Sequence, residues 1–294
     1  MPPEAESMST DYTLAWATDI HLDQCDTEHF DAFIESIQSV APQGLCLTGD
    51  LSEATTLERD LCGIADRLEI PVYFVLGNHD YYHGSIAEVR QEMRKLSTRH
   101  PFLRWLPAVG KVALNTNTTL IGHGGWGDGG NGNIQKSWIR LQDFRKIKEL
   151  MDANGHDESW TLEERKNRPI TPELITLLKQ LGQEGAEHIK PLLYEVLRDA
   201  SAPHHVVLLM HAPPFRETCL YGTEMADDHW AAHFTCKAMG DVIEDAAKTF
   251  PQHQITVLAG HTHNVCDVSY RDNLRVCVGA AEYGSPMLAK HFIF

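Results

Sequence analysis

The amino-acid sequence predicts an α/β fold, and three observations lead to this prediction. Short apolar runs alternate with longer amphipathic segments, which is the pattern of strands joined by crossover helices. Several of the apolar runs end in polar side chains, as strands do where a sheet carries a binding site. The 294 residues are enough to bury a core without disulfides, and the seven cysteines form no CxxC pair. We expect a single domain over residues 1–294.

The first part of the chain predicts three strands, each followed by a helix. The apolar runs that predict the strands span residues 13–18, 44–48 and 71–76. The segments that predict the helices span residues 27–40, 55–69 and 84–99. Two further apolar runs, 102–107 and 111–121, extend the predicted sheet.

The middle of the chain predicts a loop and then a helical insertion. Residues 122–133 read GHGGWGDGGNGN and contain seven glycines, which makes a regular element costly. We expect a mobile loop that serves as a solvated connector; the alternative is a loop that closes over a bound substrate, with Trp126 stacking on a base. Residues 134–200 are charged and helical, and we expect an insertion or cap. Within it, Thr171 and Pro172 predict the start of a helix.

The last part of the chain returns to the alternating pattern. It predicts a strand at 205–210, a helix at 235–249, a strand at 255–259 and a strand pair at 265–270 and 274–279.

The charge of the chain restricts its partners. With 25 basic and 41 acidic side chains the formal net charge is −16, and no basic block is present. A long nucleic acid is therefore not expected as a partner, because phosphate neutralisation by Lys and Arg supplies most of that affinity. No apolar run approaches the ~20 residues that span a bilayer, and the N-terminus shows no secretory signal. We expect no membrane partner and a cytoplasmic location; the oligomeric state is not predicted.

Polar side chains follow five of the predicted strands, at the point where each strand ends. In chain order they are Asp19 and His21, then Asp50, then Asn78, His79 and Asp80, then His211, and finally His261 and His263. The carboxyl ends of the strands of an open α/β sheet lie together, so we expect these side chains to converge. His261 and His263 would share one side of an extended chain, because side chains alternate along a strand.

The donor types in this set predict a metal site. Two carboxylates, one amide oxygen and several imidazoles suit Mn, Fe or Zn better than Ca or metals that prefer thiolates. There are enough donors for two adjacent divalent ions, with one carboxylate bridging. Two-metal sites activate water and stabilise in-line displacement at phosphorus, which predicts hydrolysis of a phosphoester.

The ordered motifs D-x-H, G-D, G-N-H-D, H and G-H-x-H resemble those of the calcineurin-like metallophosphoesterase superfamily. They stand here as Asp19-Ile20-His21, Gly49-Asp50, Gly77-Asn78-His79-Asp80, His211 and Gly260-His261-Thr262-His263. The resemblance spans residues 13 to 280. It implies a four-layer α/β/β/α sandwich with two mixed sheets, a helical insertion and a dinuclear metal centre at the strand ends.

The resemblance also implies a role for each residue. Asp19, His21 and His263 correspond to ligands of the first metal ion. Asn78, His211 and His261 correspond to ligands of the second, and Asp50 bridges the two. His79 corresponds to the residue that contacts the phosphoryl oxygen or protonates the leaving group, and Asp80 would hold its imidazole. The implied reaction is in-line attack on phosphorus by a hydroxide held between the metals.

Departures from the family pattern favour one subgroup. The Arg that marks the Ser/Thr protein phosphatases is missing after Asp50, and Glu53 stands where purple acid phosphatases place a tyrosine ligand. The remaining resemblance is to the bacterial phosphodiesterase-like group, which implies a small phosphodiester substrate, with a nucleotide as one candidate. Three alternatives stay open: a phosphomonoesterase of the same fold, a metal-binding scaffold without turnover, and a hydrolase of the amidohydrolase or metallo-β-lactamase type. The last of these families place His-x-His early in the chain, whereas here it comes last.

Overall fold

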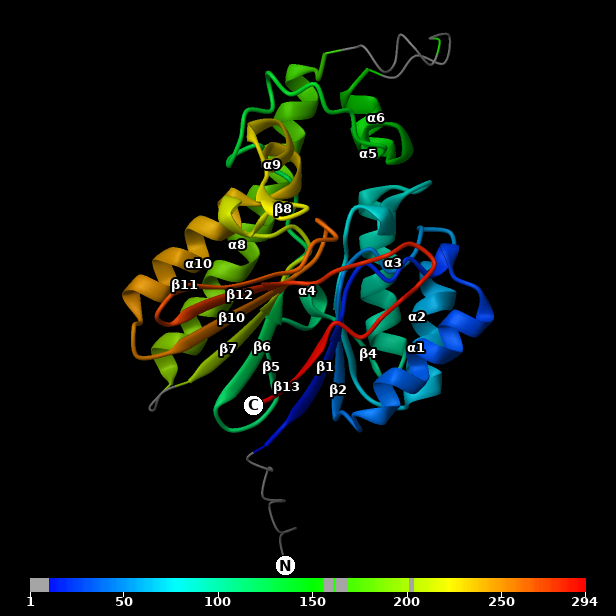
Figure 1. The fold of residues 1–294 in the computed structure, drawn as a ribbon, viewed down its shortest axis with the longest axis vertical. Coiled ribbons are helices and arrows are strands. Elements are labelled where there is room, and N and C mark those ends of the chain that lie inside the picture. The colour runs from blue at the N-terminus through cyan, green and yellow to red at the C-terminus, as the bar shows by residue number, and fades with distance from the viewer. Residues whose placement is uncertain (1–10, 156–160, 162–168, 201–203) are drawn as a thin grey trace, which may run out of the picture.

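Two large sheets lie face to face in the computed structural model, and helices cover the outer face of each (Figure 1). The structure describes residues 11–155, 161, 169–200 and 204–294. The layers run helix, sheet, sheet, helix. The predicted α/β/β/α sandwich with two mixed sheets is confirmed.

The first sheet has the strand order β13-β1-β2-β3-β4. Its four parallel strands are β1 (Thr13–Ala17), β2 (Gly44–Thr48), β3 (Val72–Val75) and β4 (Leu103–Trp105). The helices on its outer face are α1 (Thr27–Ser39), α2 (Leu57–Leu68) and α3 (Ile86–Arg99). The sequence pattern did not predict the fifth strand, β13 (Lys290–Ile293), which pairs antiparallel with β1 from the other end of the chain.

The second sheet has the strand order β11-β12-β10-β7-β6-β5. Its parallel strands are β6 (Thr118–Gly122), β7 (His205–Leu209), β10 (Gln254–Ala259) and β12 (Leu274–Val278). The antiparallel edge strands are β5 (Val112–Ala113) and β11 (Cys266–Arg271). The helices on its outer face are α8 (Pro172–Asp199) and α10 (Lys237–Thr249).

Strand β1 shows how the sequence pattern builds the layers. Ala15 and Ala17 belong to the core between the first sheet and its helices, whereas Leu14 and Trp16 belong to the core between the two sheets. Because successive side chains of a strand point to opposite faces, one continuous apolar run serves both cores. All four side chains are at most 2% exposed.

The predicted insertion at 134–200 has two parts in the structure. Helix α8 begins at its predicted cap, where the Thr171 side chain accepts a hydrogen bond from the amide of Leu174. Its second half packs on the second sheet through Ile189 and Leu193, so this part is a layer of the sandwich and not a cap. The short helices α5 (Asp143–Lys146) and α6 (Lys148–Ala153) instead lie near the strand ends (Figure 1).

Shorter elements complete the chain. They are the helices α4 (Leu106–Val109) and α9 (Asp228–Phe234), the strands β8 (Leu220–Tyr221) and β9 (Glu224–Met225), and the 3-10 turns at Leu22–Gln24, His79–Tyr81 and Arg216–Thr218. The sequence pattern did not predict α9 or the β8–β9 hairpin. Both contribute to the pocket described below.

The glycine-rich loop 122–133 is packed inside the molecule. A side chain at Gly124 would lie 2.0 Å from the carbonyl oxygen of Leu76, and one at Gly127 would lie 1.8 Å from that of His233. Trp126 is 7% exposed, and its ring lies 5.7 Å from that of Tyr81. Both expectations for this loop, a lid that stacks on a base and a solvated connector, are therefore wrong: the glycines allow close backbone packing.

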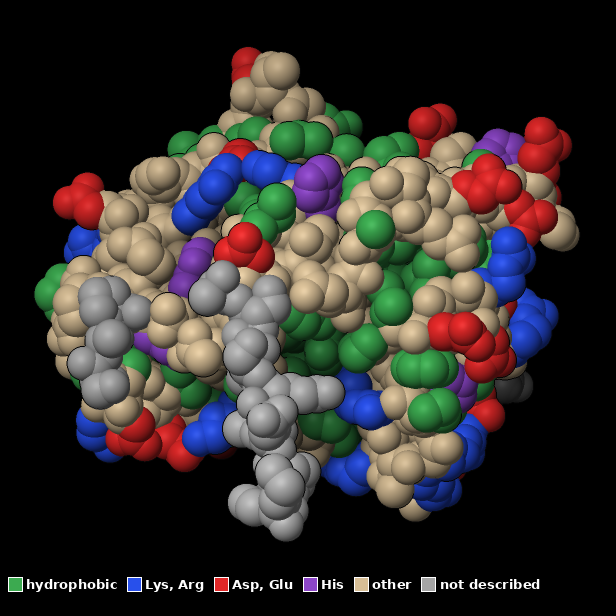
Figure 2. Space-filling model, turned by 90° about the horizontal axis from the view of Figure 1, so that it is seen from below, with side chains coloured by type: hydrophobic (Ala, Val, Ile, Leu, Met, Phe, Trp, Pro, Cys, Tyr) green, Lys and Arg blue, Asp and Glu red, His purple; other side chains and the backbone are tan. Residues whose placement is uncertain are grey.

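Charged side chains of both signs mix on the face shown in Figure 2. Lys and Arg side chains stand apart on it, with Asp, Glu and His between them. This face therefore presents no broad surface of one sign. Among the residues that the structure describes, no helix combines the length and apolarity needed to cross a membrane.

Candidate metal centre

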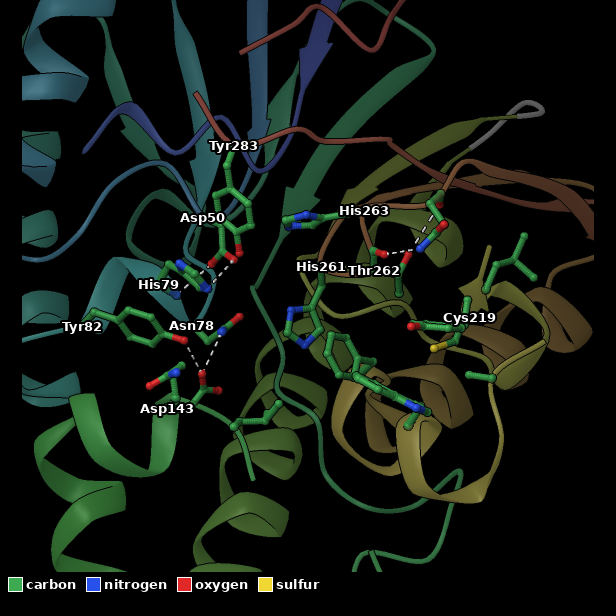
Figure 3. Close-up of a pocket in the computed structure, with 18 residues that line it drawn as sticks. Asp50, Asn78, His79, Tyr82, Asp143, Cys219, His261, Thr262, His263 and Tyr283 are labelled. Carbon is green, nitrogen blue, oxygen red and sulfur yellow. Dashed lines mark hydrogen bonds and ion pairs between the residues drawn. The ribbon is translucent and has the colours of Figure 1, made fainter. Parts of the chain in front are cut away.

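The structure brings all seven predicted ligands together at the carboxyl ends of five strands. They follow β1 (Asp19 and His21), β2 (Asp50), β3 (Asn78), β7 (His211) and β10 (His261 and His263). Figure 3 shows Asp50 and Asn78 from the first sheet facing His261 and His263 from the second. The first sheet contributes every oxygen donor, and the second contributes three imidazoles.

The backbone at these positions adopts a conformation that non-glycine residues rarely take. The φ angle is positive at five of the seven ligands: 48° at Asp19, 40° at His21, 52° at Asp50, 71° at His261 and 55° at His263. Left-handed backbone costs about 1–3 kcal/mol at such a residue and is concentrated at functional sites. The expectation that His261 and His263 share one side of an extended chain is therefore wrong, and the two imidazoles belong to different donor groups.

Glycines beside the ligands make room for them. A side chain at Gly77 would lie 2.2 Å from Oδ1 of Asp50, and one at Gly260 would lie 2.0 Å from Oδ2 of Asp19. The glycines of the G-N-H-D and G-H-x-H motifs are thus required by the close approach of a carboxylate from a neighbouring strand.

One donor group consists of Asp19, His21, Asp50 and His263. Nε2 of His263 lies 3.3 Å from Oδ1 of Asp19 and 3.4 Å from Nε2 of His21. The donor atoms of all four side chains lie within 4.8 Å of one another. The backbone amide of His261 holds the Asp19 carboxylate in place, because it donates to both carboxylate oxygens, at 3.0 and 3.1 Å.

The other donor group consists of Asp50, His211 and His261, with Asn78 beside them. Nε2 of His211 lies 3.0 Å from Oδ1 of Asn78, 3.1 Å from Nδ1 of His261 and 3.3 Å from Oδ1 of Asp50. Asp50 is the one residue common to both groups. A carboxylate that bridges two metal ions must belong to both donor groups, as Asp50 does.

The imidazoles of His211 and His261 each form a hydrogen bond on the side that faces away from the donor group. These hydrogen bonds show that the donor group fits a cation. Nδ1 of His211 donates to the carbonyl oxygen of Thr48 at 2.9 Å, and Nε2 of His261 donates to that of His233 at 3.3 Å. A carbonyl can only accept, so in the neutral rings the inner nitrogens carry lone pairs. Four acceptor atoms then face one another, which is favourable when a metal ion lies between them.

The pKa values of the protein without metal also indicate that this donor group favours a positive charge. Burial alone would lower the pKa of His211, but the carboxylates of Asp50 and Asp19 raise it to about 10. The pKa of Asp50 stays well below its usual value despite burial, because His211 and His79 lie beside it. A proton on His211 thus partly takes the place of a cation, and metal binding must displace it.

Asp80 does not hold the imidazole of His79, and the predicted role is corrected. Its Oδ1 accepts the amides of Leu51 and Ser52 at 2.7 and 3.1 Å, and its Oδ2 accepts those of Asp50 and Gly77 at 3.0 and 2.7 Å. Both oxygens are therefore occupied by backbone donors. Asp80 is a positioning residue, because it joins the loops that carry Asp50 and Asn78.

His79 is positioned by an aromatic neighbour instead. Its ring stacks on that of Tyr82, with centroids 4.2 Å apart and an angle of 27° between the planes. Its Nε2 lies 3.9 Å from Oδ2 of Asp50, and its side chain is 17% exposed. The imidazole therefore lines the pocket beside the donor groups, where it can meet a bound ester.

Asp143 belongs to the site although the sequence did not predict it. Its carboxylate is buried and accepts hydrogen bonds from Nδ2 of Asn78 at 3.0 Å and from the hydroxyl of Tyr82 at 2.7 Å. A carboxylate can only accept, so Asp143 turns the amide nitrogen of Asn78 outward and its oxygen toward the donor group. No motif marks Asp143, since its partners are 61 and 65 residues away.

A pocket of about 330 Å³ opens beside the donor groups. Tyr82 and Asp143 lie on one side, Cys219 lies on the other, and His261 lies between them (Figure 3). The side beyond His261 is formed by the β8–β9 hairpin and α9. The site thus has a polar end with the metal donors and an apolar end without them.

Comparisons with known proteins agree with this geometry. Residues 12–265 match the family model described as calcineurin-like phosphoesterase. An uncharacterized metallophosphoesterase of Campylobacter jejuni is 33% identical over 98 residues, which are 31% of this chain and 25% of that protein. The chain thus spans about a quarter of the length of this curated relative.

Solved structures show the same fold. A phosphopantetheinyl hydrolase of Mycobacterium tuberculosis superposes with a TM-score of 0.55 at 14% identity, covering 92% of this chain and 90% of that one. A dimetal phosphatase of Danio rerio superposes with a TM-score of 0.50 at 14% identity, covering 92% and 87%. These similarities concern the fold alone. With the family model matching most of its length, the chain belongs to the calcineurin-like phosphoesterase family, and the predicted family is confirmed.

Proposed function

We propose that the protein hydrolyses a small phosphodiester and that it binds two divalent metal ions to do so. Asp19, His21 and His263 would hold one ion, Asn78, His211 and His261 would hold the other, and Asp50 would bridge them. When bound, such ions lower the pKa of water and neutralise charge on the phosphoryl oxygens. The mixed oxygen and nitrogen donors suit Mn, Fe or Zn.

The surrounding residues have separate tasks in this proposal. His79 lines the pocket beside the donor groups, and its imidazole would donate to the leaving oxygen as a general acid. Tyr82 keeps the imidazole in that orientation by stacking on it. Asp80 fixes the loops of Asp50 and Asn78, so the donor groups are already formed before substrate arrives.

The observation that supports a diester most is the two-ended pocket. A phosphomonoester needs room for one substituent, whereas a diester needs room for a second. Beyond the donor groups, the pocket continues along Cys219, Leu220 and Ala226, which offer apolar surface and no charge. Mononucleotide esters are one class of diester that fits this description, and we expect them to be processed in the cytoplasm.

The proposal is tested on the purified protein. Mass spectrometry measures the bound metals, and hydrolysis of bis-p-nitrophenyl phosphate is compared with that of p-nitrophenyl phosphate after addition of Mn, Zn, Fe or Ni. We expect about two metal ions per chain and faster turnover of the diester. A strong preference for the monoester would contradict the diester assignment, and inactivity with every metal would favour a binding scaffold.

A further inference from the structure

The apolar end of the pocket contains three aromatic side chains, Tyr221 on β8 and Trp230 and Phe234 on α9. We refer to these three residues as the aromatic wall. The mechanism proposed above uses none of them. They come from the two elements that the sequence pattern did not predict.

The aromatic wall forms a continuous row of rings that ends at the metal donors. Tyr221 stacks on Trp230 with centroids 5.3 Å apart and an angle of 23°. Trp230 lies 5.4 Å from Phe234, and Phe234 stacks on His261 at 4.5 Å and 27°. Tyr221 is 65% exposed at the outer end of the row. The row of rings therefore connects the exposed outer end of the pocket at Tyr221 with the proposed metal ligand His261.

The pocket offers no cation for a second anionic group. Among its described lining residues there is no Lys and no Arg. Two cations on neighbouring elements are engaged elsewhere, since Arg216 pairs with Asp228 and Lys237 pairs with Asp241. A phosphate or carboxylate at the apolar end would thus lose its hydration without gaining a charged partner.

Neutral polar groups can still be recognised there. Thr262 and Asn264 line the same pocket. The Thr262 hydroxyl and the Asn264 amide bond to each other's backbone and Oδ1 of Asn264 accepts from the amide of Gly222, yet a hydroxyl and an amide each have capacity for a further hydrogen bond. Such groups form hydrogen bonds with the edge of a planar ring while the aromatic surface contacts its face.

We propose that the aromatic wall binds the second substituent of the phosphodiester, and that this substituent is a neutral group with a planar aromatic face, as in a nucleoside, and carries no further phosphate. This inference rests on the proposed function. It specifies the substrate class by charge and shape, which the metal donors alone do not do.

Three p-nitrophenyl esters test the proposal on the metal-loaded, full-length chain, because the bond that breaks is the same in each. One carries thymidine through its 5′-phosphate, one carries a methyl group, and one carries thymidine with an additional 3′-phosphate. We expect kcat/KM for the thymidine ester to exceed that for the methyl ester by about tenfold or more, since stacking of a base on an aromatic side chain supplies an effect of this order. The additional phosphate should abolish most of this gain.

Substitutions in the aromatic wall test whether it causes the preference for the thymidine ester. Trp230→Ala and Tyr221→Ala should lower kcat/KM for the thymidine ester about tenfold and leave the methyl ester within about twofold. Met225→Ala is the matched control, because Met225 is exposed on the same hairpin but does not line the pocket. It should change neither ester. Phe234 is left intact because it stacks on a proposed ligand.

Several outcomes would overturn the inference. Equal turnover of the thymidine and methyl esters, a preference for the ester with the second phosphate, or an equal loss for both esters in Trp230→Ala would each contradict it while leaving the proposed function intact. A dimer in size-exclusion chromatography that Tyr221→Ala disrupts, with no change in selectivity, would assign the wall to a second copy of the chain. Inactivity toward all three esters with every metal would instead refute the proposed function, and the inference with it.

Discussion

The two ends of the pocket are built in opposite ways. The proposed metal donors lie at the ends of five buried strands, and five of the seven have left-handed backbone, with glycines beside them that leave no room for a side chain. The aromatic wall lies on a two-stranded hairpin and a seven-residue helix, and its outermost ring is 65% exposed. One end is fixed by the core of the sandwich, whereas the other is carried by short elements at its surface.

This difference suggests that the donor end of the pocket carries out the reaction, whereas the aromatic wall selects the substrate. A residue held by buried strands on both sides keeps its geometry when the substrate changes, and substitution there should affect every substrate. A residue on a short surface element can change without disturbing the core, and substitution there should affect only substrates that reach it. The predictions below test whether this separation holds, in order of decreasing effect.

The largest effect is expected at Asp50, the residue common to both donor groups. Asp50→Asn removes a charge that lies between the two groups, so metal content and turnover of all esters should fall together, to background for turnover. Mass spectrometry and steady-state kinetics on the same preparation measure this. Asp241→Asn, at an exposed ion pair on α10, is the control and should retain both. A variant at Asp50 that is active without bound metal would refute the assignment.

A smaller effect is expected at His79. His79→Ala should keep the metals and lose about 10²- to 10⁴-fold in kcat, because a positioned proton donor contributes this much. The loss should be greatest for alkyl esters, whose leaving oxygen needs the proton most. His83→Ala serves as a control, since His83 is half exposed and pairs with Glu53 at 3.6 Å. An equal loss for nitrophenyl and alkyl esters would exclude proton donation by His79.

Asp143 should act on metal affinity through Asn78. Asp143→Ala frees the amide of Asn78 to rotate, and we expect binding of one of the two ions to weaken by about 10- to 100-fold. Asp143→Asn retains a carbonyl oxygen that accepts from Asn78 and Tyr82, so it should rescue most of the affinity. Titration of the chelated protein with Zn²⁺ and its melting temperature without metal distinguish positioning from a loss of folding. Normal affinity in Asp143→Ala would show that Asn78 is oriented by other contacts.

The smallest effect is expected for a substitution at Asp267, which lies away from both ends of the pocket. Asp267 on β11 accepts from Arg275 at 2.7 Å and from Lys290 at 3.2 Å, and these hydrogen bonds lower its pKa to about 2. The site is solvent-exposed, so Asp267→Asn should cost less than about 1 kcal/mol in the free energy of unfolding at pH 7.

The contribution of Asp267 to the free energy of unfolding should depend on pH. A carboxyl whose pKa is depressed in the folded state stabilises it above the unfolded pKa of about 3.9, and this stabilisation is lost as the pH falls toward 2. The difference between the wild-type protein and Asp267→Asn in urea unfolding should therefore be constant between pH 5 and pH 7 and shrink below pH 4. A difference that grew on acidification would contradict the ion-pair explanation. Ester turnover should be unchanged.

The sequence by itself determined the alternation of strands and helices and which polar side chains would meet at the strand ends. Apolar runs of five or six residues alternating with amphipathic segments leave few arrangements other than strands joined by crossover helices. The donors could be named because each directly follows one of these runs, and the carboxyl ends of parallel strands must meet. Both inferences depend on spacing within a few residues, which the sequence displays directly.

The tertiary structure alone decided how the donors are grouped and what surrounds them. His261 faces His211, 50 residues away, while its neighbour His263 faces Asp19, and left-handed backbone at both histidines separates them. Asp80 binds backbone amides of two loops, and Asp143 reaches Asn78 from another part of the chain. The aromatic wall depends on two short elements that have no periodic pattern of their own. These features arise from contacts between segments that are distant in the sequence, and such contacts form only when the chain folds.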